Sequence, residues 1–236
     1  EFSQQMEDTV RASRKLLEKF LKENRAIYGV TTGFGENVRF AISPEEATVL
    51  QQNIIRTHAV AVGEPLDRTQ ARAVMLMTIL SAGQGHSGVR IETLELIRQM
   101  LNRDLVPFAP SEGSVGYLGV EAHLVMAYIG EGKIFQNGEP VPADQVLRAN
   151  GLTPLVLSYK EGLSMLNGTI IITALGLLAV YDGIIAVQNV ELAGALCYEA
   201  LRGTTKALDP RIHQVKRHEE QASSARNLLR ILRGSE

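Results

Sequence analysis

The chain has 236 residues, of which 45% are hydrophobic and 21% charged, which is enough apolar material for one large or two modest globular cores. Its 24 basic and 26 acidic side chains nearly balance, which argues against an extended field that attracts nucleic acid or an anionic membrane. The single cysteine, Cys197, excludes an internal disulfide and a thiolate metal cluster, and predicts a reducing, cytoplasmic location.

The first part of the chain predicts helices separated by a glycine-containing loop. Apolar residues recur at helical spacing over 5–22 among charged residues, which is typical of an amphipathic helix. Residues 28–40 contain three glycines and no helical period, so they predict a loop with unusual backbone angles. Start signals at 43–46 and 67–70 open two further helices, and Gly83 closes the second of them.

The middle of the chain predicts a helix, a loop, a second helix and a hairpin. A helix is expected over 91–101, followed by a proline-punctuated loop that ends in Gly-Ser-Val-Gly at 113–116. An apolar helix then starts near Glu121 and stops at Gly130, and backbone amides at such a start stabilise negative charge on a ligand. Asn137-Gly138 between short β-prone runs predicts a type I′ hairpin, and a short helix follows.

From residue 158 the chain predicts helix, with a break at Asn167-Gly168 and then a long apolar helix toward Leu201. Residues 169–187 approach the length of a membrane span, but Asp182 interrupts them and no basic cluster flanks them. This favours a buried helix of a soluble bundle; a membrane-anchored protein would require the segment to partition into detergent. The predicted fold class is mainly α with a small amount of β in the N-terminal region.

Single residues do not decide a function. A tyrosine such as Tyr28 beside glycine turns is more commonly packed than catalytic, and a histidine such as His58 on an apolar helix is more commonly a core residue. His86 and His123 have no partner at metal-ligand spacing, so no metal site is predicted. Asn167 fits either an ordinary helix break or an asparagine presented to a ligand.

The conjunction of motifs resembles a known family. The stretches YGVTTGFG at 28–35, THAVAVGEPL at 57–66, GHSGVR at 85–90 and KEGLSMLNGT at 160–169 occur in the order and near the spacing of the aromatic amino acid ammonia-lyases. The chain resembles the histidine ammonia-lyase branch over essentially its whole length. The resemblance implies a mainly helical homotetramer with active sites shared between subunits, and a carbon–nitrogen lyase that removes an amine and a β-proton.

The resemblance also implies residue roles. Tyr28 matches the tyrosine proposed as base for the β-proton, a role that requires a stabilised phenolate because the ordinary tyrosine pKa is about 10. His58 matches the histidine that favours histidine or tyrosine over phenylalanine as substrate. Asn167 matches the asparagine beside the electrophilic cofactor, and Gly35 lies in the turn that closes the site.

The chain departs from the family at the cofactor. In the family, 4-methylidene-imidazol-5-one (MIO) forms from an Ala-Ser-Gly segment that follows Gly-Ser-Val-Gly and precedes Asp-Leu-x-Pro. Here Gly116 is followed directly by Tyr117 and Leu118, which flank the cofactor position, and the chain is three residues short before Ala122-His123. Tyr117 and Val120 stand where the family has its aspartate and proline.

Two explanations are open. A matured MIO is one non-standard group, which a one-letter transcription omits between Gly116 and Tyr117. We favour the other, loss of the cofactor, because a site that still needed MIO is expected to keep the aspartate and proline. MIO makes an amine a better leaving group, and a quaternary trimethylammonium departs without it. Loss therefore points to a trimethylated histidine betaine such as ergothioneine, as in the similar MIO-free ergothionases of this superfamily.

Completeness and activity leave further alternatives. Family members are about twice this long, and the chain begins without an initiator methionine, so we expect a fragment with an N-terminal active-site domain at 1–157 and the start of a central helical bundle at 158–236. A second chain or a missing C-terminal half is expected to complete the site. The rival hypothesis is a catalytically inactive relative that acts as a structural or assembly subunit. Neither nucleic acid nor membrane is expected as a partner.

Overall fold

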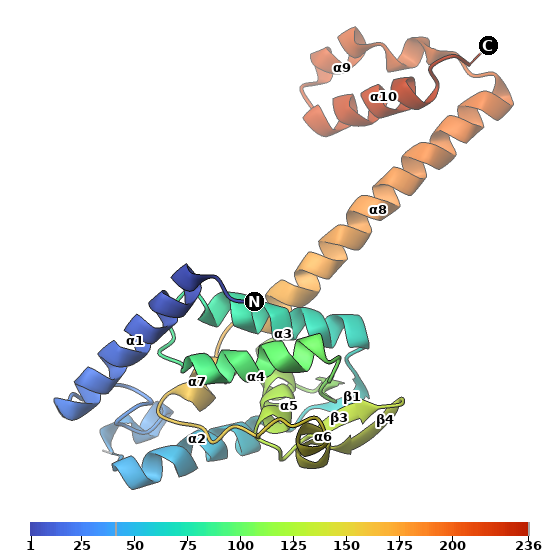
Figure 1. The fold of residues 1–236 in the computed structure, drawn as a ribbon. Coiled ribbons are helices and arrows are strands. Elements are labelled where there is room, and N and C mark those ends of the chain that lie inside the picture. The colour runs from blue at the N-terminus through green and yellow to red at the C-terminus, as the bar shows by residue number, and fades with distance from the viewer. Residues whose placement is uncertain (41, 236) are drawn as a thin grey trace. The chain divides into compact units, whose positions relative to one another are not determined.

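The computed structural model describes residues 1–40 and 42–235 (Figure 1). The chain forms two compact units, Glu1–Gly176 and Leu177–Glu236. The predicted fold class is confirmed, because helices dominate and the described residues form only two small antiparallel sheets of two strands each. The domain boundary predicted at 157/158 stays a prediction and differs from the division between these two units.

The elements of the first unit are α1 (Gln4–Lys22), η1 (Gly35–Arg39), α2 (Pro44–His58), β1 (Val62–Pro65), α3 (Arg68–Ala82), α4 (Ile91–Asn102), β2 (Pro110–Glu112), η2 (Val115–Tyr117), α5 (Leu118–Tyr128), β3 (Lys133–Gln136), β4 (Glu139–Pro142), α6 (Ala143–Ala149), α7 (Glu161–Leu166) and the start of α8 (Ile170–Leu201).

The predicted helix starts are confirmed where a side chain caps the backbone. The side chains of Ser43 and Asp67 accept hydrogen bonds from the backbone amides of Glu46 and Gln70. In turn, the side-chain oxygens of Glu46 and Gln70 accept hydrogen bonds from the backbone amides of the two cap residues. These reciprocal bonds satisfy donors that every helix start leaves free. Local chemistry therefore places α2 and α3, whatever they pack against.

Helix α5 is the centre of the first unit. It is apolar on nearly all sides, as expected of a helix surrounded by protein, and it packs against α2, α7, α6, β2 and β3. Its start at Leu118 lies three residues before the predicted one at Glu121. The reason is the loop, where Tyr117 adopts a left-handed conformation and the Ser114 hydroxyl accepts a hydrogen bond from the Gly119 amide at 2.7 Å.

The two small sheets differ in how far the sequence predicted them. The hairpin of β3 and β4 is confirmed, with Asn137 at φ 54° and Gly138 at φ 86°, as a type I′ turn requires. The pairing of β1 with β2 was not predicted from the sequence. The paired residues, Val62 with Glu112 and Pro65 with Pro110, are 50 and 45 positions apart in the chain, so no local pattern predicts the pairing.

Helix α8 has 32 residues, and the expectation that it is buried is wrong for most of its length in this chain. Ile171 and Ala174 are buried in the first unit, but Val190 and Leu196 are 71% and 70% exposed. It is the one helix of the described residues that is long and apolar enough to cross a membrane, by length and composition alone.

The second unit completes α8 with η3 (Thr205–Leu208), α9 (Pro210–Lys216) and α10 (Glu219–Ile231). Its small core joins Ala195 of α8 to Leu208, Ala225 and Leu232.

Candidate active site

Three helices carry or adjoin the site residues that the sequence predicted. Helices α2, α5 and α7 pack against one another. His58 is the last residue of α2, and a Cβ atom added to Gly119 in the first turn of α5 would lie 3.2 Å from the His58 carbonyl oxygen. The start of α5 therefore lies directly against the end of α2, which places His58 beside the Tyr117-Leu118 position.

The first turn of α5 also reaches the chain that follows Asn167. The Glu121 carboxylate accepts a hydrogen bond from the Ile171 amide at 3.3 Å, in the first turn of α8. Asn167 follows α7, is exposed, and donates its backbone N–H to Leu163 at 2.9 Å. The structure thus gathers the segments that carry His58, Tyr117 and Asn167 around one end of α5.

His58 is half-buried, and its ring orientation is set from within α2. Its Nδ1 lies 2.7 Å from the Ile54 carbonyl oxygen and 3.3 Å from the Thr57 hydroxyl. A carbonyl oxygen only accepts, so Nδ1 carries the proton in the neutral ring and Nε2 is the acceptor nitrogen. His58 therefore offers an acceptor to a ligand N–H.

The loop before α5 has two consecutive residues in the left-handed region. Gly116 has φ 66° and Tyr117 has φ 64°. This conformation costs nothing special for glycine but of order 1–2 kcal/mol for tyrosine. A non-glycine residue held there marks a candidate functional position, because surrounding structure must stabilise it.

The residues present at this loop do not fit formation of MIO. Gly116 passes directly into Tyr117 and Leu118, and the tripeptide Ala-Ser-Gly occurs nowhere in the 236 residues. The residues given at this loop therefore do not supply the tripeptide from which the family cofactor forms.

Tyr28 and Gly35 lie together, as the resemblance implied for the turn that closes the site. The Gly35 amide donates a hydrogen bond to the Tyr28 hydroxyl oxygen at 3.1 Å, and the Phe34 ring meets the Tyr28 ring edge-on with centroids 6.2 Å apart. The Tyr28 side chain is 52% exposed, and within the described residues no hydrogen bond joins it to 116–118.

The Tyr28 turn is attached to the core through Gln51 of α2, which is fully buried. The Gln51 side-chain amide donates to the Gly29 carbonyl oxygen at 3.2 Å and accepts from the Leu163 amide of α7 at 3.1 Å. Gln51 and His58 are seven residues apart on α2, a rise of roughly 10 Å. The tyrosine turn is therefore held near the middle of α2, and His58 stands at its end.

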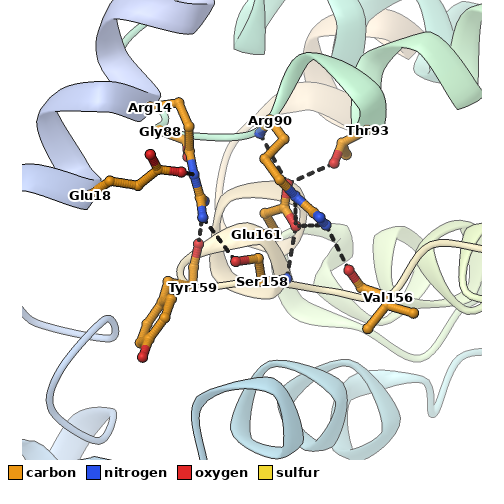
Figure 2. A network of polar contacts seen from close by, with 9 residues as sticks. All are labelled: Arg14, Glu18, Gly88, Arg90, Thr93, Val156, Ser158, Tyr159 and Glu161. Carbon is orange, nitrogen blue, oxygen red and sulfur yellow. Dashed lines mark hydrogen bonds and ion pairs between the residues drawn. The ribbon is translucent and has the colours of Figure 1, made fainter. Parts of the chain in front are cut away.

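Helix α7 is fixed by the buried carboxylate of Glu161 (Figure 2). Its Oε1 accepts from the Arg90 amide at 3.0 Å and the Thr93 hydroxyl at 2.7 Å, and its Oε2 accepts from the Arg90 guanidinium at 2.6 Å and the Ser158 amide at 2.8 Å. Burial raises the pKa of Glu161, but these hydrogen bonds outweigh it and the net pKa is lowered. Glu161 is therefore ionised at neutral pH.

Arg14 of α1 extends this network (Figure 2). Its guanidinium donates to the carbonyl oxygens of Gly88 and Tyr159, both at 3.3 Å, and to the Ser158 hydroxyl at 2.8 Å. Glu18 lies beside it, 2.9 Å away. Charge-assisted hydrogen bonds thus join the family motif at 85–90 to residues 158–159, which directly precede the family motif at 160–169.

Helix α5 buries polar atoms that have no hydrogen-bond partner in the described structure: Glu121 Oε2, His123 Nε2 and the Tyr128 hydroxyl. Burial raises the pKa of Glu121 to about 8, and the bond from Ile171 lowers it only in part. Burial raises the pKa of Tyr128 above its usual range, and Glu121 adds to this. Burial lowers the pKa of His123, and a backbone hydrogen bond with Ala61, which raises it, offsets only part of this effect.

Two large cavities of the first unit lie elsewhere. One of about 680 Å³ is lined by α4 and residues 151–156, and one of about 610 Å³ lies beside β1 and the hairpin turn. Tyr28, His58 and Asn167 line neither of them. Among the described residues, no group of three or more His, Cys, Asp or Glu side chains is placed to hold a metal ion.

Gln51, Glu161 and Glu121 were not singled out from the sequence. The signal for Glu121 was available, since it is an acidic residue within an apolar run. Gln51 and Glu161 are polar residues in ordinary helical surroundings, and only tertiary contacts show that both are fully buried.

Comparison with known proteins finds similarity over the whole chain. The family model for aromatic amino acid lyase matches residues 1–236. A histidine ammonia-lyase of Alkaliphilus oremlandii is 40% identical over 238 residues, which cover 100% of this chain and 47% of that protein.

Solved structures agree as well. A tyrosine aminomutase from Streptomyces globisporus has a TM-score of 0.95 and 36% identity, covering 99% of this chain and 45% of that one. An ergothionase from Treponema denticola has a TM-score of 0.86 and 26% identity, and the match covers 97% of this chain and 46% of that one. The chain spans less than half the length of these relatives, and it belongs to the aromatic amino acid lyase family.

Proposed function

We propose that the protein is a carbon–nitrogen lyase that eliminates an amine from histidine or a histidine-derived betaine and leaves a urocanate-type product. The match of the aromatic amino acid lyase family to all 236 residues carries this proposal. The 40% identity to a histidine ammonia-lyase supports histidine-type substrates.

In this proposal Tyr28 removes the β-proton. The electron pair of that C–H bond forms the Cα=Cβ double bond, the Cα–N bond breaks, and the nitrogen leaves with its electron pair as a neutral amine. The Gly35 amide, which donates to the Tyr28 oxygen at 3.1 Å, orients this oxygen within its turn. His58 would accept a hydrogen bond from the substrate ring through Nε2, and Asn167 would line the pocket with its amide.

Within this class we propose a trimethylammonium leaving group. The loop at Gly116-Tyr117 has no Ala-Ser-Gly segment from which the electrophile could form. A quaternary nitrogen carries a full positive charge and departs without an electrophile. The similarity to an ergothionase supports this substrate class.

The working protein is proposed to be a cytoplasmic homotetramer in which a second chain or the remaining half completes the site. This chain covers 47% of its histidine ammonia-lyase relative. The exposed apolar side chains of α8 are consistent with further helices that pack on it.

The decisive experiment compares two substrates and two variants. The purified protein is incubated with histidine and with ergothioneine, and ammonia and trimethylamine are measured. Tyr28→Phe is expected to lower turnover by about 10²- to 10⁴-fold with little loss of stability. Tyr181→Phe, which removes the same hydroxyl from an exposed tyrosine, is the matched control and should keep full activity. Ammonia from histidine without trimethylamine from ergothioneine would refute the betaine substrate.

The rival function, an inactive structural or assembly subunit, is favoured by the same missing tripeptide. It predicts no turnover of either substrate and no measurable effect of Tyr28→Phe. Intact mass separates the two explanations of the loop. A mass above that of the encoded residues by one Ala-Ser-Gly segment less two waters would place MIO between Gly116 and Tyr117.

A further inference from the structure

Gln51 joins two segments that carry predicted site residues. Its side-chain amide donates through Nε2 to the Gly29 carbonyl oxygen, next to Tyr28, at 3.2 Å. Through Oε1 it accepts from the Leu163 amide, four residues before Asn167, at 3.1 Å. Both contacts are made by one fully buried side chain, so water does not compete for them.

The backbone around Gln51 is packed too closely for side chains. A Cβ atom on Gly162 would lie 2.5 Å from the Gln51 carbonyl oxygen and 3.0 Å from its Oε1. A Cβ atom on Gly29 would lie 2.6 Å from the Phe34 ring and 2.7 Å from the Leu163 side chain. These distances are shorter than ordinary contacts between carbon atoms. Gln51 therefore bridges the Gly29 turn and α7 at places where neither backbone has room for an added side chain.

One of these segments is itself held rigidly. Glu161, at the start of α7, binds the guanidinium and amide of Arg90 and the hydroxyl of Thr93 (Figure 2). From Leu163 to Asn167 the chain rises by roughly 6 Å. A fixed α7 therefore gives Gln51 a fixed reference, and the Tyr28 turn is placed relative to it.

We infer that Gln51 is a positioning residue that holds the Tyr28 turn in register with the Asn167 end of α7. The inference rests on the proposed function, in which Tyr28 takes the proton and Asn167 lines the pocket. Gln51 touches neither substrate nor reacting atoms and acts only through Tyr28. Displacing a catalytic group by about 1 Å costs of order 10²-fold in rate, so loss of this bridge should lower kcat more than it changes KM.

The first variant is Gln51→Glu, which has the same size, keeps the acceptor for the Leu163 amide and loses the donor to Gly29. We expect kcat with the turned-over substrate, histidine or ergothioneine, to fall about 10- to 100-fold while KM stays within about twofold. The control is Gln52→Glu, the same chemical change at the neighbouring, partly buried residue. The Gln52 side chain makes no hydrogen bond in the described structure, so this variant should leave kcat and KM unchanged.

A double variant separates positioning from general damage. In the Tyr28→Phe background, Gln51→Glu should cost less than about twofold, because the residue it positions is already disabled. The same loss in both backgrounds would overturn the inference. Gln51→Met, which is uncharged and of similar length, is measured in parallel. It tests the inference even if the buried carboxylate of Gln51→Glu prevents folding.

Amide hydrogen exchange provides a readout that does not depend on activity. Gln51→Met should raise exchange over residues 28–35 by at least about tenfold while α4 stays as protected as in the parent protein. Unchanged exchange over 28–35 would overturn the inference even for an inactive protein. A parent protein that turns over neither substrate would refute the proposed function, a result distinct from either outcome for Gln51.

Discussion

Helices α7 and α8 follow one another in the chain and are held in opposite ways. α7 has six residues, too few for a helix that is stable alone, yet it buries Glu161, Gly162, Met165 and Leu166. Polar side chains from α2 and α4 fix it within this chain. α8 has 32 residues, and beyond Leu177 most of its apolar side chains are exposed.

The difference shows two ways to place a helix. Directional hydrogen bonds from a few buried polar residues fix a short helix, because an unpaired buried group is costly in any other arrangement. A long apolar helix has no such directional contacts and needs an apolar surface to cover it. α7 is thus placed by contacts inside this chain, whereas α8 lacks an apolar cover over most of its described length.

The largest effect should come from breaking the fixed helix. Glu161→Gln leaves the Arg90 guanidinium without its buried charge partner, and we expect the free energy of unfolding to fall by about 3 kcal/mol. Urea unfolding measures it. Glu92→Gln, an exposed glutamate at the start of α4, is the control and should change stability by less than about 0.5 kcal/mol. A loss below about 1 kcal/mol for Glu161→Gln would mean that apolar packing, rather than this ion pair, places α7.

An effect of comparable size is expected where α5 meets the start of α8, at the buried Glu121 of α5. Burial raises the pKa of Glu121 in the folded chain from 4.5 to about 8, so between these pH values the folded state keeps a proton that the unfolded state releases. The stability contributed by this site is therefore full below pH 4.5 and is lost as pH rises toward and through about 8. The total change is on the order of a few kcal/mol.

Unfolding in urea at pH 5 and pH 8.5 tests this, with Glu121→Gln as the variant. The parent protein should lose more stability than the variant across that interval, because the glutamine amide does not titrate. If the parent protein and the variant lost equal amounts of stability between pH 5 and pH 8.5, Glu121 would be shown to be hydrated or paired in solution.

The smallest effect on stability is expected on the exposed face of α8. Leu196 is 70% exposed, so Leu196→Lys should change the free energy of unfolding by less than about 0.5 kcal/mol. In the complete protein it should instead lower the assembly mass measured by sedimentation. Leu16→Lys on the amphipathic α1, where the leucine is 50% exposed, is the matched control and should leave the mass unchanged. Partition of the parent protein into detergent micelles through α8 would contradict the proposed assembly and favour a membrane contact.

Short-range signals were sufficient for many elements of the fold. The caps at Ser43 and Asp67 and the turn at Asn137-Gly138 lie where the sequence predicted them, because each depends on atoms within a few residues. The start of α5 was predicted three residues late, since the left-handed Tyr117 has no sequence signature. The β1–β2 pair and the exposure of α8 were missed, because both depend on tertiary packing rather than on neighbouring residues.

The candidate site likewise contains residues that the sequence identified and residues that only the structure identified. Motif order singled out Tyr28, His58, Gly35 and Asn167, and the structure joins Tyr28 to Gly35 and sets His58 against the start of α5. Their catalytic roles remain predictions. Gln51, which links the tyrosine turn to α7, could not be found in this way, since a glutamine on a helix looks the same whether it faces solvent or a buried pair of backbone groups.

The amino-acid sequence by itself determined the helix caps, the hairpin turn, the family and the absence of an Ala-Ser-Gly segment, because these are properties of neighbouring residues or of their order. Tertiary structure alone decided which polar residues are buried and paired. Glu161 and Gln51 became the fixed points around α7 because folding removed water from them, and a buried polar group then has to bond to whatever donor or acceptor the packing brings within about 3 Å.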